Sequence, residues 1–554
     1  MPKYPLLRVL TFAIFASAFS LANPAQQSIE PSAVKPPAST NAPVPATPVS
    51  AGIDPFGPAM HLYRERKFDD ASAAFQKLAQ TGGSEAPKAY AWLARAQLRL
   101  DNVPEAEAAA QKALSLSENL ATAHSALGEV YFREGKLPDA ERQFLTPLKA
   151  GVADPRAYYG EARLSRINSN YKHAKMLIDK AHTLDPDDPE IQAFWIMTLP
   201  RGNDVAVVST PSSVVEPGKS GEAKDKPAQP QATSDQSKPA PESTCRLVTS
   251  ATSTEAPLER LMYDYHLFRA FGLKVIVNGT PSTLMLDTGA SGITINTKLA
   301  ERAGVHRIKD TKIGGVGDAG LASGYFALAD SLQVGGLEFK GCEILVLDKK
   351  RSMGEDGFIG SDVFQSFLVE INFPDEKLKL SELPQSPEAT EEPLSLFSDS
   401  YAPFGLRDRY IAPEMRSYER VYRIGHNLLL PTYVNTTANT RLFLLDTGAY
   451  DIALNVDFAR QVTRVHNDDF TTLKGINGRV KYVYSADAVK LGFPQSRLMQ
   501  EGRNVTAFDL SDQSQNDGIE ISGIIGFSLL YLLDIKIDYR DGLVSFSYDP
   551  HRLH

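Results

Sequence analysis

Two aspartates in the C-terminal half of the 554-residue chain stand in the same short motif, and their type and spacing suit acid–base chemistry. Asp287 follows the apolar run 284–286, Asp446 follows the apolar pair 444–445, and Thr-Gly-Ala comes directly after each. Two carboxylates held about 3 Å apart cannot both ionise readily, so they share one proton. One member can then take a proton from water while the other donates one. The sequence therefore predicts that Asp287 and Asp446 act as a single unit.

The motif is the first of several landmarks that occur twice in the same order. Each aspartate is followed by a glycine-bearing turn, then by an apolar pair closed by glycine, and then by an alternating strand. The landmarks are 287–290, 314–317, 357–360 and 369–373 in the first copy, and 446–449, 475–478, 523–526 and 535–539 in the second. A lone Asp-Thr-Gly arises by chance in roughly one chain in ten of this length. The ordered repetition instead indicates an internal duplication.

The duplicated region resembles the aspartic proteases, in particular the compact retropepsin-like type, over residues 262–382 and 420–549. The resemblance implies an all-β double barrel, a pseudo-dimer in which each half delivers one aspartate at a tight turn. It also implies that the two motif threonines hydrogen-bond across the interface, while the glycines bring backbone N–H groups near the carboxylates. These supporting residues are Thr288, Gly289, Thr447 and Gly448. Pairing of the halves within one chain or between two chains is left open.

The glycine-bearing turns correspond, in the same resemblance, to flaps that close over a substrate and exclude water. The predicted flap and substrate-binding residues are Gly314, Gly315, Val316 and Gly317 in the first copy, and Gly475, Ile476 and Gly478 in the second. Ordinary hairpin turns are the alternative. The first turn also matches GxGxxG, but no buried strand precedes it and no helix pattern follows, which argues against a dinucleotide site.

The two copies differ just after the motif. Ser291 in the first copy corresponds to the bulkier Tyr450 in the second, and Asp451 is the candidate to supply the polar group that supports the turn. The polar stretch 500–518 in the second copy predicts an exposed loop. A pair of barrels that binds peptide without cutting it is the alternative to an enzyme, although a pure binder needs neither aspartate.

Residues 56–200 contain a helical pattern with a fixed period. Alanine recurs every 34 residues at three positions, and a fourth copy is one residue out of step. These positions are Ala71, Ala106, Ala140 and Ala174. Small residues such as Ala94 and Gly128 let paired helices approach closely. The pattern resembles the tetratricopeptide repeat, which implies an all-α solenoid with a concave peptide-binding face. A spacer or an oligomerisation scaffold is the alternative role.

The remaining segments predict export and connection. Residues 1–22 combine two basic residues, a short apolar run and small residues before a cleavage site, which is typical of a signal peptide. Residues 23–52 and 201–250 predict a disordered stalk and a disordered linker, and 383–419 connects the two copies. An uncleaved anchor is the alternative to cleavage. We expect a periplasmic or secreted protein with no transmembrane anchor after signal cleavage.

The chain contains only two cysteines, Cys245 and Cys342. In an oxidising compartment they can pair as a disulfide, and two free thiols are the alternative. Neither they nor the histidines show the spacing of a zinc site, so we expect no metal and no other cofactor. The net charge is −9 and the sequence contains no Lys/Arg-rich block, so we expect no basic surface that would bind nucleic acid.

The patterns predict a multidomain protein in which an all-α tetratricopeptide-type solenoid precedes an all-β acid-protease-like double barrel. The resemblance implies an exported aspartic endopeptidase that hydrolyses peptide bonds with a water activated by Asp287 and Asp446. The helical repeats would recruit a protein substrate or partner. The alternative is a tetratricopeptide adaptor that carries a non-catalytic, protease-like peptide-binding module.

Overall fold

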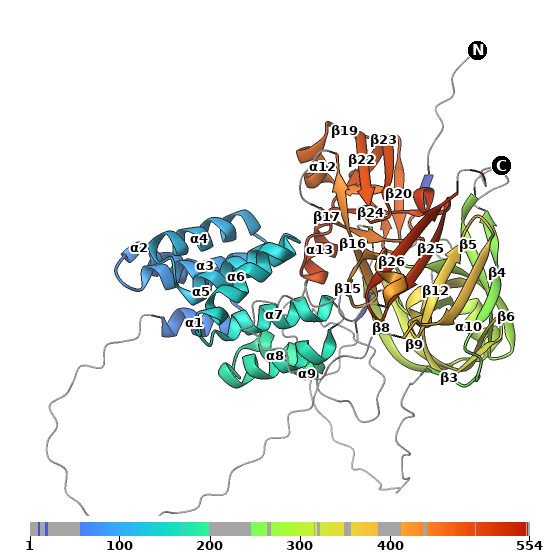
Figure 1. Ribbon diagram of the computed structural model, residues 1–554, viewed down its shortest axis with the longest axis horizontal. Coiled ribbons are helices and arrows are strands. Elements are labelled where there is room, and N and C mark those ends of the chain that lie inside the picture. The colour runs from blue at the N-terminus through green and yellow to red at the C-terminus, as the bar shows by residue number, and fades with distance from the viewer. Residues whose placement is uncertain are drawn as a thin grey trace, which may run out of the picture.

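A helical region and a larger β region lie side by side in the computed structural model of the chain (Figure 1). The structure describes residues 9–11, 17–19, 56–168, 170–198, 245–262, 268–314, 316–317, 322–347, 356–385, 412–435, 440–493, 495–549 and 551. The predicted stalk at 23–52 and residues 201–244 of the predicted linker lie outside them. No helix in the described part of the chain is long and apolar enough to cross a membrane.

Nine described helices, packed in consecutive pairs, form the helical region. They are α1 (Gly57–Arg64), α2 (Phe68–Thr81), α3 (Ala86–Arg99), α4 (Val103–Leu116), α5 (Ala121–Arg133), α6 (Leu137–Lys149), α7 (Pro155–Ile167), α8 (Tyr171–Leu184) and α9 (Pro189–Thr198). The repeat alanines lie in α2, α4, α6 and α8, and each is at most 1% exposed. At Gly128 in α5, an added Cβ would lie 2.5 Å from the Phe144 ring. The small residues therefore permit the close helix packing that the period predicts.

The first β half carries the first Asp-Thr-Gly motif at the end of β6. Its elements are β3 (Arg246–Leu247), β4 (Thr254–Met262), β5 (Phe268–Val277), β6 (Thr280–Asp287), β7 (Ile293–Asn296), α10 (Thr297–Ala303), β8 (His306–Gly314), β9 (Ala322–Val334), β10 (Leu337–Leu347), β11 (Gly357–Gly360), η1 (Ser361–Phe364), β12 (Phe367–Asn372) and β13 (Lys377–Glu382). Strand β6 pairs antiparallel with β5 and parallel with β11, and the β11 register sets Gly360 opposite Asp287.

The second β half repeats this plan. Its elements are η3 (Pro413–Met415), β14 (Glu419–Arg420), β15 (Tyr422–Ile424), β16 (Asn427–Val434), β17 (Arg441–Leu445), β18 (Ala453–Asn455), α12 (Val456–Val462), β19 (Val465–Asn467), β20 (Thr472–Gly475), β21 (Gly478–Arg479), β22 (Tyr484–Phe493), β23 (Leu498–Phe508), α13 (Ser511–Asp517), β24 (Gly523–Ile525), α14 (Phe527–Leu530), β25 (Leu533–Asp538) and β26 (Leu543–Tyr548). Strand β17 pairs antiparallel with β16 and parallel with β24, as β6 does with β5 and β11.

Two sequence-based boundaries are wrong. The stretch 500–518 is not an exposed loop, because β23 continues to Phe508 and α13 follows, with Phe508 and Leu510 at most 1% exposed. Its first residues are mostly exposed, but residues 505–508 are a continuous buried run, which the polar composition concealed. The predicted linker also ends before residue 250, because β3 pairs with β10, and the first half begins at β4 rather than at residue 262.

A shared sheet joins the two halves within this one chain. Strand β12 of the first half pairs antiparallel with β25 of the second, with Val369 opposite Ile537. The sheet runs through both halves in the order β14-β26-β25-β12-β13-β4. Both Val369 and Ile537 are fully buried, and one hydrophobic core contains residues of both halves. The structure thus shows the intramolecular pairing that the sequence left open.

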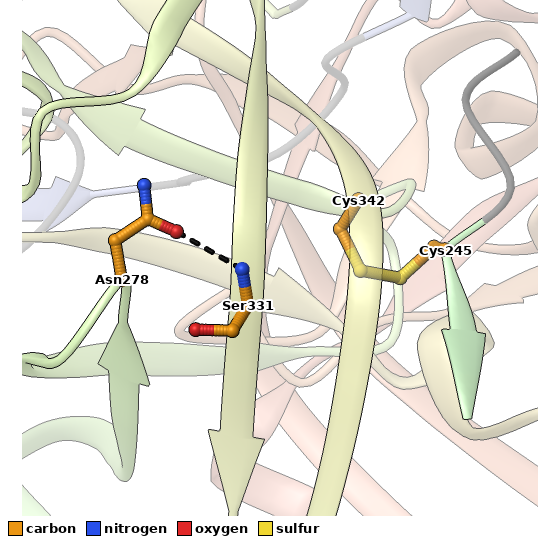
Figure 2. The surroundings of a disulfide bond; sticks show 4 residues. All are labelled: Cys245, Asn278, Ser331 and Cys342. Carbon is orange, nitrogen blue, oxygen red and sulfur yellow. Dashed lines mark hydrogen bonds between the residues drawn. A yellow bond between two sulfur atoms is a disulfide. The ribbon is translucent and has the colours of Figure 1, made fainter. Parts of the chain in front are cut away.

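A disulfide joins Cys245 to Cys342, 97 residues further along the chain (Figure 2). Cys342 lies in β10 and is fully buried, whereas Cys245 is exposed and precedes β3. Next to it, the Asn278 side chain accepts a hydrogen bond from the Ser331 backbone N–H at 3.0 Å. The covalent link therefore fixes the start of the β region onto the first half.

Two short strands from the N-terminal segment pair with the strands that carry the predicted flaps. Strand β1 (Val9–Thr11) runs parallel to β20, and β2 (Ser17–Phe19) runs antiparallel to β8. Both lie inside the predicted signal peptide at 1–22. The free edges of β8 and β20 can therefore bind an extended backbone.

The helical region docks on the second β half (Figure 1). The Arg133 carbonyl at the end of α5 accepts a hydrogen bond from the Glu520 backbone N–H at 2.6 Å, and Arg163 of α7 donates to the Gly518 carbonyl at 3.4 Å. One hydrophobic cluster contains residues of α5 to α9 together with Leu442 and its neighbours in the second half. The repeats and the second half thus share a core.

Candidate active site

The two aspartates lie at the ends of buried central strands. Asp287 is the last residue of β6, Asp446 directly follows β17, and both are fully buried. The apolar residues that precede each aspartate are also buried, because the strand runs between barrel neighbours on both sides. Burial of the strand therefore carries the polar carboxyl group into the centre of the molecule.

The two motif threonines exchange hydrogen bonds across the interface. The Thr288 backbone N–H donates to Thr447 Oγ1 at 3.0 Å, and the Thr447 N–H donates to Thr288 Oγ1 at the same distance. Each hydroxyl then donates to the strand of the other half, Thr288 to the Leu445 carbonyl at 2.9 Å and Thr447 to the Leu286 carbonyl at 3.0 Å. Each turn is therefore complete only when the other half is present.

The motif glycines bring the two carboxyl groups together. The Gly289 N–H donates to Asp287 Oδ1 and the Gly448 N–H donates to Asp446 Oδ1, both at 2.9 Å. A Cβ added at Gly448 would lie 2.4 Å from the Asp287 carboxyl carbon, and one at Gly289 would lie 2.7 Å from that of Asp446. Only residues without a side chain permit this crossed approach.

The electrostatics of the pair favour a shared proton. Burial raises the pKa of Asp287, and burial together with the charge of Asp287 raises the pKa of Asp446 well above its usual range. The remaining Oδ2 atom of each aspartate accepts no hydrogen bond from a donor among the described residues. The pair thus keeps a proton at a pH where an ordinary aspartate has lost it.

The predicted flap residues meet above the aspartates. Gly314, Val316 and Gly317 lie at and after the end of β8, Gly475, Ile476 and Gly478 lie in the β20–β21 hairpin, and Gly315 is outside the described residues. The Asn477 N–H donates to the Val316 carbonyl at 3.0 Å. Ile476 packs with Phe358 of the first half, and Val316 packs with Leu444 of the second. Each flap tip thus crosses to the opposite half.

A carboxylate and a serine support each catalytic turn, but the two halves place them in opposite positions. In the first half, Asp362 after the closing glycine accepts hydrogen bonds from the Gly292 N–H at 2.9 Å and from Ser291 Oγ at 3.4 Å. In the second half the carboxylate is on the turn itself: Asp451 accepts from Ser528 Oγ at 2.5 Å. Asp451 therefore supplies the carboxylate of this turn.

Sequence reasoning missed Asp362 and Ser528. Each is the second residue after the closing glycine of its half, so alignment of the two copies from Gly360 and Gly526 was the available signal. Burial raises the pKa of Asp362 to about 6, against the lowering effect of the Gly292 N–H and of the Arg423 charge.

The β15–β16 hairpin of the second half, also missed, reaches across to the first. Arg423 donates to Gln365 Oε1 at 2.7 Å. Burial lowers the pKa of the His426 imidazole to about 4, against the raising effect of the Gly289 backbone nearby. Tyr539, the residue after β25, likewise shares a hydrogen bond of 2.5 Å between its hydroxyl and Ser361 Oγ. Residues of the second half therefore contact the segment that follows the closing glycine of the first half.

No group of three or more His, Cys, Asp or Glu side chains within the described ranges could hold a metal ion. The chemistry available at the site is that of two carboxyl groups with one proton between them, closed off by the flaps. Such a pair can activate a water and polarise a carbonyl oxygen.

Comparison with known protein families matches both regions of the chain. The family described as aspartyl protease matches residues 273–363, which include Asp287. Two families described as tetratricopeptide repeat match residues 59–121 and 121–145. The predicted architecture of a tetratricopeptide region followed by a retropepsin-like β region is thereby confirmed.

Solved structures also match. The crystal structure of a retropepsin-like aspartic protease from Rickettsia conorii shares 18% sequence identity, over 24% of this chain and 93% of that chain, with a TM-score of 0.18. No curated protein matches the chain.

Proposed function

We propose that this chain, which combines tetratricopeptide repeats with an aspartyl protease domain of the retropepsin-like type, is an exported aspartic endopeptidase. The observation that carries the proposal is the buried pair Asp287 and Asp446, whose turns interlock and whose glycines lie against each other's carboxyl groups. A protein that only bound peptides would gain nothing from burying two ionisable groups face to face, since such burial is destabilising.

The proposed reaction uses the shared proton of the pair. The ionised carboxyl takes a proton from a water whose oxygen attacks the scissile carbonyl, while the protonated carboxyl donates its proton to the carbonyl oxygen. The tetrahedral diol then breaks its C–N bond: the leaving nitrogen takes the proton that the first carboxyl gained from water, and one diol hydroxyl returns its proton to the second carboxyl as the new carboxyl group forms. These two transfers restore the single shared proton of the pair. Since the pair titrates as one unit, neither role belongs to one aspartate alone.

The flaps support an extended polypeptide as the substrate. Their strands β8 and β20 already pair with the short strands β2 and β1 of the N-terminal segment. An extended substrate would gain the same backbone hydrogen bonds and, beneath the crossed tips of Val316 and Ile476, would be shielded from bulk water. Opening of these flaps then admits substrate and releases product.

Two features support export to the periplasm or beyond the cell. Residues 1–22 have the pattern of a signal peptide. The Cys245–Cys342 disulfide is of the kind that persists in oxidising compartments. The helical repeats, which dock on the second half, are proposed to recruit a protein substrate or partner.

The test is cleavage of an unfolded protein by the purified chain between about pH 3 and pH 8, a range that brackets the usual carboxyl pKa and the raised values here. Because burial raises the pKa values of Asp287 and Asp446, activity should extend above the ordinary aspartate range and fall as rising pH removes the shared proton. Fragments identified by mass spectrometry measure it, with Asp287→Asn as the control. A chain that cleaves nothing in this range but binds peptides is instead a tetratricopeptide adaptor with a non-catalytic module.

A further inference from the structure

A cavity of about 330 Å³ lies where the helical repeats meet the second β half. Its walls come from α1, α7 and α9 of the repeats and from the β15–β16 hairpin and α13 of the second half. The domain junction, rather than the repeat groove alone, forms this cavity. Neither domain could build it without the other.

The cavity carries an excess of positive charge. Its arginines are Arg66, Arg99, Arg163, Arg166 and Arg423, against the carboxyl groups of Glu190 and Asp517. Glu190 is already paired, with Arg99 at 2.7 Å and with Arg156 at 2.5 Å. Asp517 accepts a hydrogen bond from Asn427, and burial raises the pKa of its carboxyl to about 7.

Arg163, Arg166 and Arg423, like Arg66, form no ion pair with a carboxylate of the described residues. Burial lowers the pKa of Arg166, and the positive charge of Arg423 lowers it further. Partly buried cations that lack a carboxylate partner are a costly arrangement, which an anionic ligand would relieve.

Aromatic rings hold the three guanidinium groups in place. The guanidinium carbon of Arg163 lies 3.8 Å from the centre of the Phe132 ring, and that of Arg166 lies 5.5 Å from the centre of the Phe194 ring. The guanidinium carbon of Arg423 lies 5.3 Å from the centre of the Tyr539 ring. Fixed in this way, the planar groups lose little freedom when they bind a carboxylate with two parallel hydrogen bonds.

A fourth donor in the cavity has no partner. Tyr63 of α1 is 2% exposed, and its hydroxyl has no hydrogen bond with any described group. Burial raises the pKa of Tyr63 to about 12, so the hydroxyl stays protonated and can donate. Buried hydroxyl groups normally find a partner.

We propose that this cavity binds an acidic segment of a polypeptide, with its carboxylates on Arg163, Arg166 and Arg423 and a further acceptor on the Tyr63 hydroxyl. A polypeptide is favoured over a compact anion because the donors come from α1, α7 and β15, with aromatic rings between them. Successive acidic side chains supply a separate carboxylate for each guanidinium group, whereas a compact anion has one charged centre to share among them.

The cavity adjoins the catalytic centre through one hairpin. Gly425 lines the cavity, and the next residue, His426, lies near enough to the Gly289 backbone of the first Asp-Thr-Gly turn for that backbone to raise the pKa of its imidazole. If the chain cleaves peptides as proposed above, an acidic segment held here positions the same polypeptide for the flaps. Binding itself does not depend on cleavage.

The test measures binding with the full chain carrying Asp287→Asn, so that cleavage plays no part. A fluorescent oligoglutamate peptide should bind, the oligoglutamine peptide of equal length should not, and binding should weaken with added salt. Arg166→Gln and Arg163→Gln should each weaken binding about tenfold, the usual effect of losing one charge-assisted hydrogen bond. Tyr63→Phe should weaken it by a smaller factor.

Arg142→Gln, at an exposed arginine of α6, is the charge-matched control and should change little. Arg166→Lys keeps the charge, so partial binding by this variant separates loss of the site from loss of the fold, which thermal unfolding also monitors. If Arg142→Gln weakened binding of the oligoglutamate peptide as much as Arg166→Gln does, the cavity would not be the binding site. Equal binding of the two peptides, or binding of inorganic phosphate without the oligoglutamate peptide, would also overturn the site.

Discussion

The two β halves are alike at the buried aspartates, the motif threonines and the flap tips. They differ in the groups that support each Asp-Thr-Gly turn and in what is attached to each half. Both bury one aspartate, exchange one pair of threonine hydrogen bonds and extend one flap tip into the other. The first half is cross-linked by a disulfide, and its supporting carboxylate is Asp362. The second carries the helical repeats, and its supporting carboxylate is Asp451.

This difference shows which features a duplicated active site has to keep. The carboxyl pair works as a unit, so loss of either aspartate ends the shared proton. A turn, by contrast, needs one carboxylate hydrogen-bonded to one serine and to a backbone N–H, and either side can supply the carboxylate. The outer surfaces of the two halves are free to differ. The first half is therefore cross-linked by a disulfide, whereas the second half contacts the helical repeats.

The largest expected effect tests whether cleavage requires both aspartates equally. Asp287→Asn and Asp446→Asn should each lower kcat/KM for cleavage by about a thousandfold, the scale of lost acid–base catalysis. Because the halves pair within one chain, a mixture of the two variants should recover no activity. Initial rates on one peptide substrate measure both. Recovery on mixing would show that chains exchange halves, and strong residual activity in one variant would mean that the halves are not equivalent.

The disulfide should distinguish the halves by stability. Cys245→Ser opens a covalent loop between residues 97 apart in sequence and should lower the free energy of unfolding by about 2–4 kcal/mol. Hydrogen exchange should show the loss in β3 and β10, with β22 and β23 unchanged. Wild type under reducing conditions is the matched control, and it should behave as the variant does. Equal loss of protection in both halves would contradict a stabilisation local to the first.

The smallest effect concerns the two supporting carboxylates. Asp362→Ala and Asp451→Ala each leave a serine and a backbone N–H without an acceptor, which should cost about 1–3 kcal/mol of stability. Displacement of the turn should lower kcat by about tenfold. Denaturant unfolding and steady-state rates measure the two effects, and Asp330→Ala at an exposed site of the first half is the control. Losses confined to one half would show that only that turn needs a carboxylate.

Local and repeated features were predictable from the sequence, because a single stretch determines each of them. The Asp-Thr-Gly motif marks a strand end, and the alanine period marks helix contacts. The Ser291–Asp362 and Asp451–Ser528 pairs join residues 71 and 77 apart, so no local pattern reveals them. The docking of the repeats was also hidden, since it depends on the complementary shapes of two surfaces.

The prediction for residues 500–518 was wrong because polarity was taken as exposure. Most polar side chains of β23 and α13 are exposed, but Thr506 and Ser514 are buried together with Phe508 and Leu510, which pack the segment against the core. The same segment supplies Gly518 to the contact with the repeats, and Glu520, two residues after it, supplies a second hydrogen bond. The part of the second half that was expected to be a loop is therefore what holds the two domains together.

The hydrogen bonds between Thr288 and Thr447 also determine when the two Asp-Thr-Gly turns can form during synthesis. The first turn lacks its Thr447 partner, and β12 lacks β25, until almost the whole chain has left the ribosome. A nascent chain therefore contains complete helical repeats long before it contains a catalytic centre. Domains generally fold as units from the N-terminus onward. On the function proposed above, cleavage cannot begin while the two aspartates are still apart, even though the repeats are already complete.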